Sequence, residues 1–538
     1  MINTKPTRLL LLVLFSVLPS CLFAQTDTLF WFAVPEVTQN GGQNFDRPIK
    51  LRITSYDDTT IVTVSQPAGN YFQPITDTIP PDSLVSIDLT TWIDFLENKP
   101  ADSVQNFGIK IVSDKRISVY YEVVSQCDCN PEIFAMKGQT ALGKDFWIPS
   151  QNLVSNNTVF TPVSNSSFDI VATSNNTQVT ILPSKNVIGH PAGLAYTVNL
   201  NRGQTYSAMA ASNLASEHLN GSRVWSNKPI AITVKDDDLR SLIFGTCSDL
   251  GGDQIVPVSV LGTEYIAING FLNGIGDQLF VLATQDSTQL FQNGIYVTTI
   301  DSGVTYQFDA GDTSTYINSN KPINVLQLSG YGCEMGIDIL PQINCTGSNE
   351  VALARSTNES FFVNMVVPAG GEGTFLVNGD PSIITSSLFS PVPGTNSQWM
   401  AGKYSIPLSL LPVGSSVRIT NNVMPFHLSV IHGGAATGTR FGYFSDFACP
   451  TSVGLFDLEE DPFDFLVFPN PVSEILNIIL EGASDAELFV YDLTGKLIFH
   501  NQFSGPNIRL DTQSWNKGLY IVVVKSGSEI KMKKVIHQ

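Results

Sequence analysis

The cysteines are the residues whose type and spacing most directly suggest bond formation. Cys127-Asp128-Cys129 looks like half of a metal site, but no histidine or second close cysteine pair is spaced to complete it. Disulfides are therefore favoured, and the six cysteines that follow Cys21 of the N-terminal segment allow fifteen full pairings, which the sequence leaves open. Cys127 is too close to Cys129 to pair with it comfortably, and Cys333 with Cys345 is the best single guess. The candidates are Cys127, Cys129, Cys247, Cys333, Cys345 and Cys449.

Three consecutive aspartates, Asp236, Asp237 and Asp238, follow a predicted strand. Hard cations such as Ca²⁺ take several oxygen ligands, which a loop of this kind offers. The glycine-spaced pattern of a calcium loop is missing, so the sequence favours a solvated acidic turn and keeps calcium as the weaker alternative. No other cofactor is expected.

The segment from Gly138 to Lys144 matches most of a phosphate-binding loop. Asp145 stands where a Ser or Thr must reach the metal ion, and a carboxylate there would repel phosphates. A strand-like Phe146-Trp-Ile-Pro follows in place of a helix. We therefore interpret the match as chance.

The six histidines do not form a recognisable catalytic pattern with their neighbours. None lies in a metalloprotease helix motif or beside a Gly-x-Ser-x-Gly elbow, and His427 and His432 are predicted to be packing or surface residues. Paired carboxylates for glycoside hydrolysis are defined by the fold and not by spacing, so a secreted carboxylate-dependent hydrolase stays a minor alternative. The sequence predicts no catalytic residues and no enzyme.

The N-terminal segment has the three-part layout of a cleaved signal peptide: Lys5 and Arg8, an apolar run, and a small-residue junction at Ala24-Gln25. The mature chain is expected to begin at Gln25, with lipidation of Cys21 as the weaker alternative. No later run approaches the roughly 18 consecutive apolar residues of a membrane-spanning helix. We expect an exported chain with no transmembrane segment after signal removal.

The charge balance argues against nucleic-acid partners. The 538-residue chain carries a formal net charge of −19 and only 14% charged residues. An acidic chain repels phosphate backbones, and basic residues cluster only at the extreme C-terminus. A polar, uncharged surface of this kind suits an extracellular β protein.

A strand-turn-strand phrase with a polar Asn/Asp-Lys turn recurs along the chain and predicts an all-β fold. The copies are roughly 90 to 115 residues apart, the size of one β-sandwich each. We expect four related antiparallel β-sandwich units, packed end to end or in pairs. The copies are Phe107–Tyr120, Ser222–Val234, Thr315–Leu326 and, more faintly, Ser416–Val430.

These copies and the composition shifts divide the chain into a signal peptide, four tandem sandwich units, an acidic linker and a small Ig-like β-sandwich. The expected bounds are 1–24 for the signal peptide, 25–135, 136–240, 241–335 and 336–450 for the units, 451–463 for the linker and 464–538 for the last domain.

Several phrases between about residues 107 and 441 resemble the IgGFc-binding protein N-terminal domain family of animal mucus proteins and Bacteroidetes surface proteins. The most specific phrase runs from Cys247 to Pro257, and Ser226–Ile230, Gly332–Glu334 and Ile339–Ser348 support it. The resemblance implies an extracellular binding or adhesive module without catalytic residues. Nothing in these phrases indicates that the chain binds antibody.

The last 70 or so residues contain five ordered motifs: Phe468–Val472, Ile475–Ile479, Leu488–Ile498, Gly518–Val524 and Lys531–Ile536. Their order and spacing resemble the type A sorting domain of the type IX secretion system. From the residues themselves, Pro469 and Pro471 are expected to open the first strand as an edge, and Gly495 to take positive φ in a tight hairpin. Lys531, Lys533 and Lys534 either contact the translocon or form a solvated strand end. The motif residues are Pro469, Asn470, Pro471, Tyr491, Asp492, Gly495, Lys496, Gly518, Tyr520, Lys533 and Lys534.

Together these patterns predict an adhesin-like binding protein, displayed on the outer cell surface by way of the periplasm. Its expected partners are the type IX translocon and an extracellular protein or glycan ligand. A structural component of the cell-surface or gliding layer is the alternative in a different class.

Overall fold

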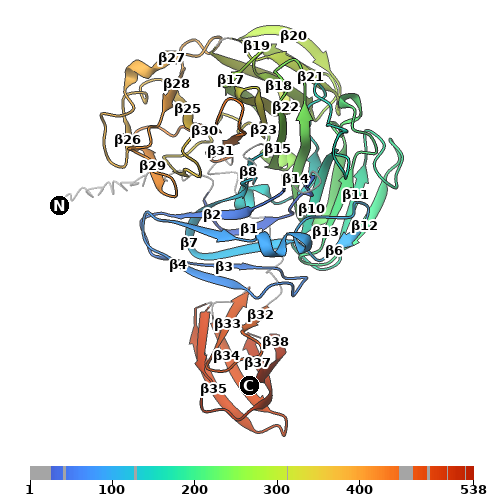
Figure 1. Ribbon diagram of the computed structural model, residues 1–538, viewed down its shortest axis with the longest axis vertical. Helices are drawn as coiled ribbons and strands as arrows, with labels where there is room; N and C mark the ends of the chain where they lie inside the picture. Colours follow the sequence, from blue (N-terminus) through green and yellow to red (C-terminus); the bar gives the residue numbers. More distant parts are fainter. Residues whose placement is uncertain are drawn as a thin grey trace, which may run out of the picture.

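The computed structural model describes residues 26–39, 44–125, 130–311, 313–447, 464–481, 485–505, 507–527 and 529–538. The signal peptide with its Ala24-Gln25 junction and the linker at 451–463 lie outside these residues. The described chain is all-β, with short 3-10 turns and multiple antiparallel sheets, as the sequence predicts (Figure 1). The 3-10 turns are η2 (Thr90–Phe95), η3 (Gly138–Ala141), η4 (Ala215–Glu217), η5 (Val258–Val260) and η6 (Ser386–Leu388).

The first unit is a sandwich whose long strand β7 takes part in both sheets. The first half of β7 pairs with β1 and β3, the second half with β2 and β8, and β4 and β5 extend the two sheets. Its strands are β1 (Asp27–Phe32), β2 (Ile49–Ser55), β3 (Thr60–Ser65), β4 (Ile75–Ile79), β5 (Leu84–Asp88), β7 (Ile109–Val123) and β8 (Glu132–Ala135).

The second unit repeats this topology around β14, and β6 (Val104–Gln105) of the first unit adds to its edge. β9 and β11 pair with the first half of β14, and β10 and β15 with the second half. Its strands are β9 (Gly143–Trp147), β10 (Ser166–Ala172), β11 (Thr177–Leu182), β12 (Tyr196–Leu200), β13 (Thr205–Met209), β14 (Arg223–Arg240) and β15 (Ser248–Ile255).

The third unit has the same plan around β22, with the short β17 as an addition. Its strands are β16 (Gly262–Ile268), β17 (Phe271–Leu272), β18 (Gln278–Ala283), β19 (Thr288–Gln292), β20 (Ile295–Ile300), β21 (Thr305–Asp309), β22 (Ser314–Gly332) and β23 (Glu334–Ile339).

The fourth unit differs because its long strand is divided into β29 and β30, which belong to separate sheets. Its Asn-Asn-Val-Met-Pro connection is longer than the Asn-Lys-Pro of its sister units, and Asn421 Oδ1 accepts the N–H groups of Val423 and Met424 within it. Its strands are β24 (Glu350–Ala354), β25 (Ser360–Pro368), β26 (Phe375–Val377), β27 (Phe389–Pro391), β28 (Trp399–Ser405), β29 (Ser416–Asn421), β30 (His427–Gly433) and β31 (Thr439–Tyr443).

The expected polar turn is, in the first three units, a bend inside one continuous strand and not a connection between two strands. In β14 the pairing with β9 shifts register between Trp225 and Ile230, because Pro229 offers no N–H. The Ser226 hydroxyl donates to the Lys228 carbonyl at 2.6 Å and fixes the bend. Ser113 and Ser319 make the same bond in β7 and β22.

The expected boundaries at residues 240 and 335 fall too early. β15 pairs with β14 as far as Ile255, and β23 pairs with β22 as far as Ile339. In both units the last strand follows the recurring strand-turn-strand pattern. The position of that pattern therefore does not indicate where the unit ends.

The four units close into a ring, which corrects the expected end-to-end or pairwise arrangement. The last strands of the units, β8, β15, β23 and β31, contact one another in a closed cycle at the centre (Figure 1). Hydrogen bonds link adjacent units: Lys137 N donates to Gln254 Oε1 at 2.8 Å, and Phe441 N donates to Glu132 Oε1 at 2.9 Å. An apolar core runs through the second and third units and reaches the fourth.

The C-terminal domain is a separate two-sheet sandwich with its own apolar core. The expectation that Pro469 and Pro471 open its first strand is wrong, because β32 precedes them and the two prolines end its pairing with β33. Its strands are β32 (Asp464–Phe468), β33 (Ile475–Glu481), β34 (Asp485–Asp492), β35 (Leu497–Ser504), β36 (Asn507–Asp511), β37 (Gly518–Ser526) and β38 (Glu529–His537).

Candidate functional site

Two pairs of carboxyl groups meet at the ring centre, where β15 contacts β23. Asp249 shares a hydrogen bond with Glu334, and Asp253 shares one with Asp338. Burial, followed by the neighbouring acid, raises the pKa of Asp249 and of Asp338 well above the usual range. Lys137, in the connection between β8 and β9, forms an ion pair with Asp253. The centre therefore joins the last strands of the second and third units through paired carboxyl groups, and Lys137 adds the end of the first unit to them.

A buried charge triad joins the first and fourth units. Glu122 lies 2.6 Å from Arg52 and 2.7 Å from Arg440. Burial alone would raise the pKa of Glu122, but Arg440 and Arg52 together lower it. Removing one partner from a buried group of this kind costs about 3–5 kcal/mol, because the remaining charge is left uncompensated.

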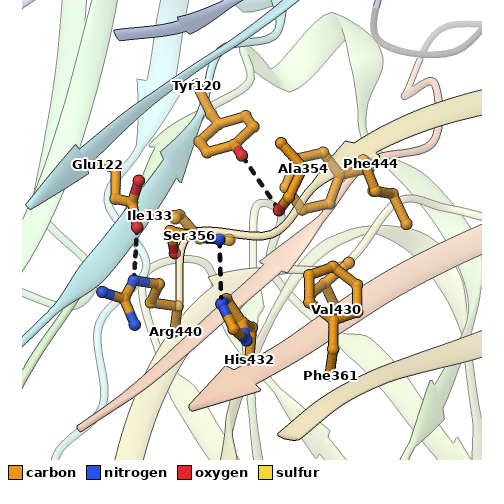
Figure 2. A pocket seen from close by; sticks show the side chains of 11 residues that line it. Tyr120, Glu122, Ile133, Ala354, Ser356, Phe361, Val430, His432, Arg440 and Phe444 are labelled. Atoms are coloured by element: carbon orange, nitrogen blue, oxygen red, sulfur yellow. Dashed lines mark hydrogen bonds and ion pairs between the residues drawn. The ribbon is translucent and has the colours of Figure 1, made fainter. Parts of the chain in front are cut away.

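A small cavity of about 10 Å³ lies beside this triad (Figure 2). His432 faces it and accepts the Ser356 N–H at 3.3 Å, while burial lowers the pKa of His432 to about 3. Such a volume holds about one water molecule, so the cavity is too small for a ligand.

The paired acids do not form the open cleft that a glycoside hydrolase needs. Asp249, Asp253, Glu334 and Asp338 are each at most 3% exposed. Each pair lies between two strands that are packed against each other. These buried positions suit a role in holding the ring together, because a substrate could reach the carboxyl groups only if the units separated.

One disulfide joins the second and third units, Cys247 to Cys333, across 86 residues of sequence. The guess that Cys333 pairs with Cys345 is therefore wrong. Cys247 directly precedes β15 and Cys333 directly precedes β23, and the contact between these two strands brings the cysteines together. Cys345 is also disulfide-bonded, and Cys127, Cys129 and Cys449 lie outside the described residues.

The three aspartates are not a solvated turn. Asp236, Asp237 and Asp238 are at most 1% exposed and belong to β14. Asp236 lies 3.3 Å from His218, itself fully buried. The surrounding units cover this stretch of the strand, which a local sequence pattern does not record.

The apparent phosphate-binding loop is occupied by a side chain of the protein itself. Gln139 N donates to Asp27 Oδ2 at 2.7 Å, and Gly138 packs against the same side chain. His427 is buried like His432, and burial lowers its pKa to about 3. Both histidines are packing residues, which is one of the two roles expected.

The first and second junctions each place the outer face of a unit's first strand against a turn of the next unit. In the first junction, Trp31 of β1 is 2% exposed. Its ring lies 5.4 Å from Lys110 Nζ and 5.6 Å from the guanidinium of Arg202, which comes from the second unit. This junction is closed to solvent.

The second junction has the equivalent residues but leaves them open. Trp147 pairs with Arg223 in the β9–β14 ladder, as Trp31 pairs with Lys110 in β1–β7. Gly303 of the third unit covers only part of the Trp147 ring. Trp225 stands on the same outer face and is 37% exposed.

Arg223 organises this open surface. Its guanidinium lies 5.4 Å from the Trp147 ring and 5.8 Å from the Trp225 ring. It also donates two hydrogen bonds to Asp145, at 3.1 and 3.0 Å. We call Asp145, Trp147, Arg223 and Trp225 the tryptophan site; the sequence analysis missed it, although the Arg-Val-Trp alternation just before Ser226-Asn-Lys could have indicated it.

The junction that closes the ring, from the fourth unit to the first, is ionic. Arg418 contacts Asp57 at 2.7 Å, Asp82 at 2.9 Å, and Glu350. A groove of about 470 Å³ lies beside it, lined by small polar side chains such as Ser55. Its volume falls in the range of small-molecule sites, but its few apolar side chains make it a weaker candidate than the tryptophan site.

The sorting motif residues lie in the Pro-Asn-Pro segment, in the β34–β35 hairpin and on the strands β34, β37 and β38 of the C-terminal sandwich. Asn470 connects the Pro-Asn-Pro segment to the last strand, because it donates to the Lys534 carbonyl and accepts the Ile536 N–H. This segment runs from Pro469 to Pro471. Lys534 is exposed, while the Lys533 ammonium lies 5.5 Å from the Phe465 ring.

The hairpin motif has the expected local geometry. Asp492 Oδ1 accepts the N–H groups of Thr494 and Lys496, and Gly495 has a φ of 82°. Tyr491 precedes this turn in β34. In β37, Gly518 begins the strand and Tyr520 is buried, with its hydroxyl donating to the Asn516 carbonyl.

Comparison with protein families identifies both parts of the chain. The model of the family described as IgGFc binding protein matches residues 134–431, more than half of the chain. The chain belongs to this family. The secretion system C-terminal sorting domain matches residues 466–538. This domain marks the IgGFc-binding family member for type IX export to the cell surface or to the outside of the cell. Neither of the two matched families is an enzyme family.

No curated protein matches the chain. The distantly similar solved structures include the BSP domain of a biofilm associated protein (9% identity, 74% of this chain and 82% of the other, TM-score 0.13) and immunoglobulin domains 1–5 of Sidekick-1 (8% identity, 95% of this chain and 99% of the other, TM-score 0.11). Scores this low carry no argument about function. Among the described residues, no helix is long and apolar enough to cross a membrane.

Proposed function

We propose that this chain is an adhesin-like binding protein of the cell surface, whose ring holds an extracellular protein or glycan ligand. The observation that carries the proposal is the tryptophan site. Trp and Arg are the residues most enriched where binding energy concentrates, because each offers a large rigid surface together with polar groups. Here two tryptophans and one arginine stand on one outer face, whereas the first junction buries Trp31 and Lys110, the equivalents of Trp147 and Arg223.

The geometry of the site suits recognition. Asp145 holds Arg223 by two hydrogen bonds, so the guanidinium is ordered before a ligand arrives. The ion pair is about two fifths exposed on both sides, so it contributes at most about 1 kcal/mol to stability. A ligand that stacks on Trp225 and accepts hydrogen bonds from Arg223 fits this arrangement.

The test is a screen of the purified mature chain on an array of glycans and extracellular proteins that includes antibody Fc. The wild type is expected to bind at least one component, and Trp225→Ala to bind it about 30-fold more weakly. Phe95→Ala is the matched control, since Phe95 is 44% exposed and stacks on Tyr71 far from the site. Equal loss in both variants, or none in Trp225→Ala, contradicts the proposal.

The sorting domain supports the second part of the proposal, that the type IX translocon is the export partner. A chain that ends at Asp461 is expected to stay in the periplasm, while the full chain reaches the surface. Lys531→Glu together with Lys534→Glu tests whether the exposed lysines contact the translocon: reduced export supports contact, and unchanged export identifies a solvated strand end. Self-association without any array component would favour a structural surface layer.

A further inference from the structure

The buried aspartates of β14 lie where the strand leaves its regular ladder. The register with β15 shifts between Asp236 and Leu239, and Asp238 has a φ of 48°. A residue with a side chain rarely adopts positive φ unless its surroundings hold it there. The bulge therefore places consecutive carboxylates, those of Asp237 and Asp238, in one buried region.

Part of this negative charge has partners. His218 lies 3.3 Å from Asp236. Asp237 Oδ2 accepts hydrogen bonds from the Thr38 N–H at 2.8 Å and the Thr38 hydroxyl at 2.7 Å. Lys235 Nζ lies 3.9 Å from the same oxygen and is shared with the Glu36 carbonyl. These contacts satisfy one oxygen of Asp237 and leave the other without a donor.

The remaining oxygens are buried and poorly satisfied. Among the described residues, Asp237 Oδ1 and both carboxylate oxygens of Asp238 receive no hydrogen bond of ordinary geometry, although Asp238 is 0% exposed. The hydroxyls of Ser164 and Ser248 lie beside Asp238. Burial and then Asp237 raise the pKa of Asp238 to about 7. The two hydroxyls and the charge of Arg240 lower the pKa of Asp238 only in part, and among the described residues Asp238 forms no ion pair. A buried carboxylate so weakly compensated costs several kcal/mol, so this region favours a bound cation.

We propose that Asp237 and Asp238 bind a calcium ion, with the Ser164 and Ser248 hydroxyls as further oxygen ligands. Two carboxylates balance its charge, and hard oxygens are what Ca²⁺ prefers, with waters completing the six to eight ligands. The ion would join β14 to the Ser164 segment and, through Thr38, to the first unit. This site is independent of the tryptophan site and of the proposed ligand.

The test is calcium binding by the full mature chain after treatment with a chelator, measured by equilibrium dialysis and by thermal unfolding. We expect one saturable ion per chain with a Kd of about 0.1–1 mM, typical of extracellular modules, and a higher unfolding temperature with calcium. Asp238→Asn is expected to weaken binding at least tenfold and to remove the thermal shift. Asp58→Asn, at an exposed aspartate of the first unit, is the control and should bind calcium as the wild type does.

The wild-type measurement alone decides the proposal even if Asp238→Asn does not fold. No saturable binding up to about 10 mM calcium overturns it, and so does binding that persists unchanged in a folded Asp238→Asn chain. Ser248→Ala removes one oxygen ligand and no charge, so a several-fold weaker Kd is expected; an unchanged Kd would overturn the ligand role of the hydroxyl.

Discussion

The first and second junctions of the ring place tryptophan in equivalent positions with different results. Trp31 is 2% exposed and is covered by Arg202 of the next unit. Trp147 is partly exposed, and Trp225 beside it is 37% exposed. A tryptophan at the same position of the strand pair thus packs between two units in the first junction, and is left partly open to solvent in the second. Repeated units can therefore keep a fold while one junction acquires a different role.

The largest expected effect is at the closed junction. Trp31→Ala removes a fully buried indole and should lower the free energy of unfolding by about 3–5 kcal/mol. Chemical denaturation of the purified mature chain measures it. A loss below about 1 kcal/mol would mean that the first junction does not hold the units together.

Trp147→Ala should cost less, about 1–2 kcal/mol, because the ring is only partly covered by Gly303 of the third unit. The same denaturation experiment compares the two variants directly. If Trp147→Ala destabilises the chain as strongly as Trp31→Ala, the second junction is as structural as the first and the comparison fails.

The pH dependence tests how buried carboxyl groups in the second and third units, on either side of the second junction, affect stability. Burial raises the pKa of Asp169 to about 7 and that of Asp277 to about 6, so the folded chain holds these protons more tightly than the unfolded chain does. The free energy of unfolding should therefore fall as the pH rises from about 4 to about 7, by about 1.4 kcal/mol for each unit by which burial raises the pKa of a group. Denaturation at pH 5.5 and pH 8 measures this trend, and higher stability at pH 8 would contradict it.

The smallest effect on stability is expected at Trp225. Trp225→Ala should change the free energy of unfolding by no more than about 0.5 kcal/mol, because the side chain is exposed and the ladder hydrogen bonds remain. Chemical denaturation of Trp225→Ala and Trp31→Ala under the same conditions compares how much each substitution lowers the free energy of unfolding. A loss above about 2 kcal/mol would make Trp225 a packing residue.

The sequence predicts the strands, the recurrence of the sandwich unit and the sorting domain, because alternation and turn chemistry are local. Ring closure depends on β8, β15, β23 and β31 meeting at the centre, which no local pattern records. For the same reason Cys333 was paired with its neighbour in sequence and not with Cys247. Asp236–Asp238 were expected in solvent because three adjacent acids are usually exposed, and only the surrounding units bury them.

The most direct test of the central claim uses intact cells that display the full chain. Binding of the strongest array component is measured for the wild type and for Trp225→Ala, with surface amounts matched by an antibody to the ring. We predict equal display and about 30-fold weaker binding by the variant. Equal display with equal binding would contradict the claim that the open second junction is where this surface protein holds its ligand.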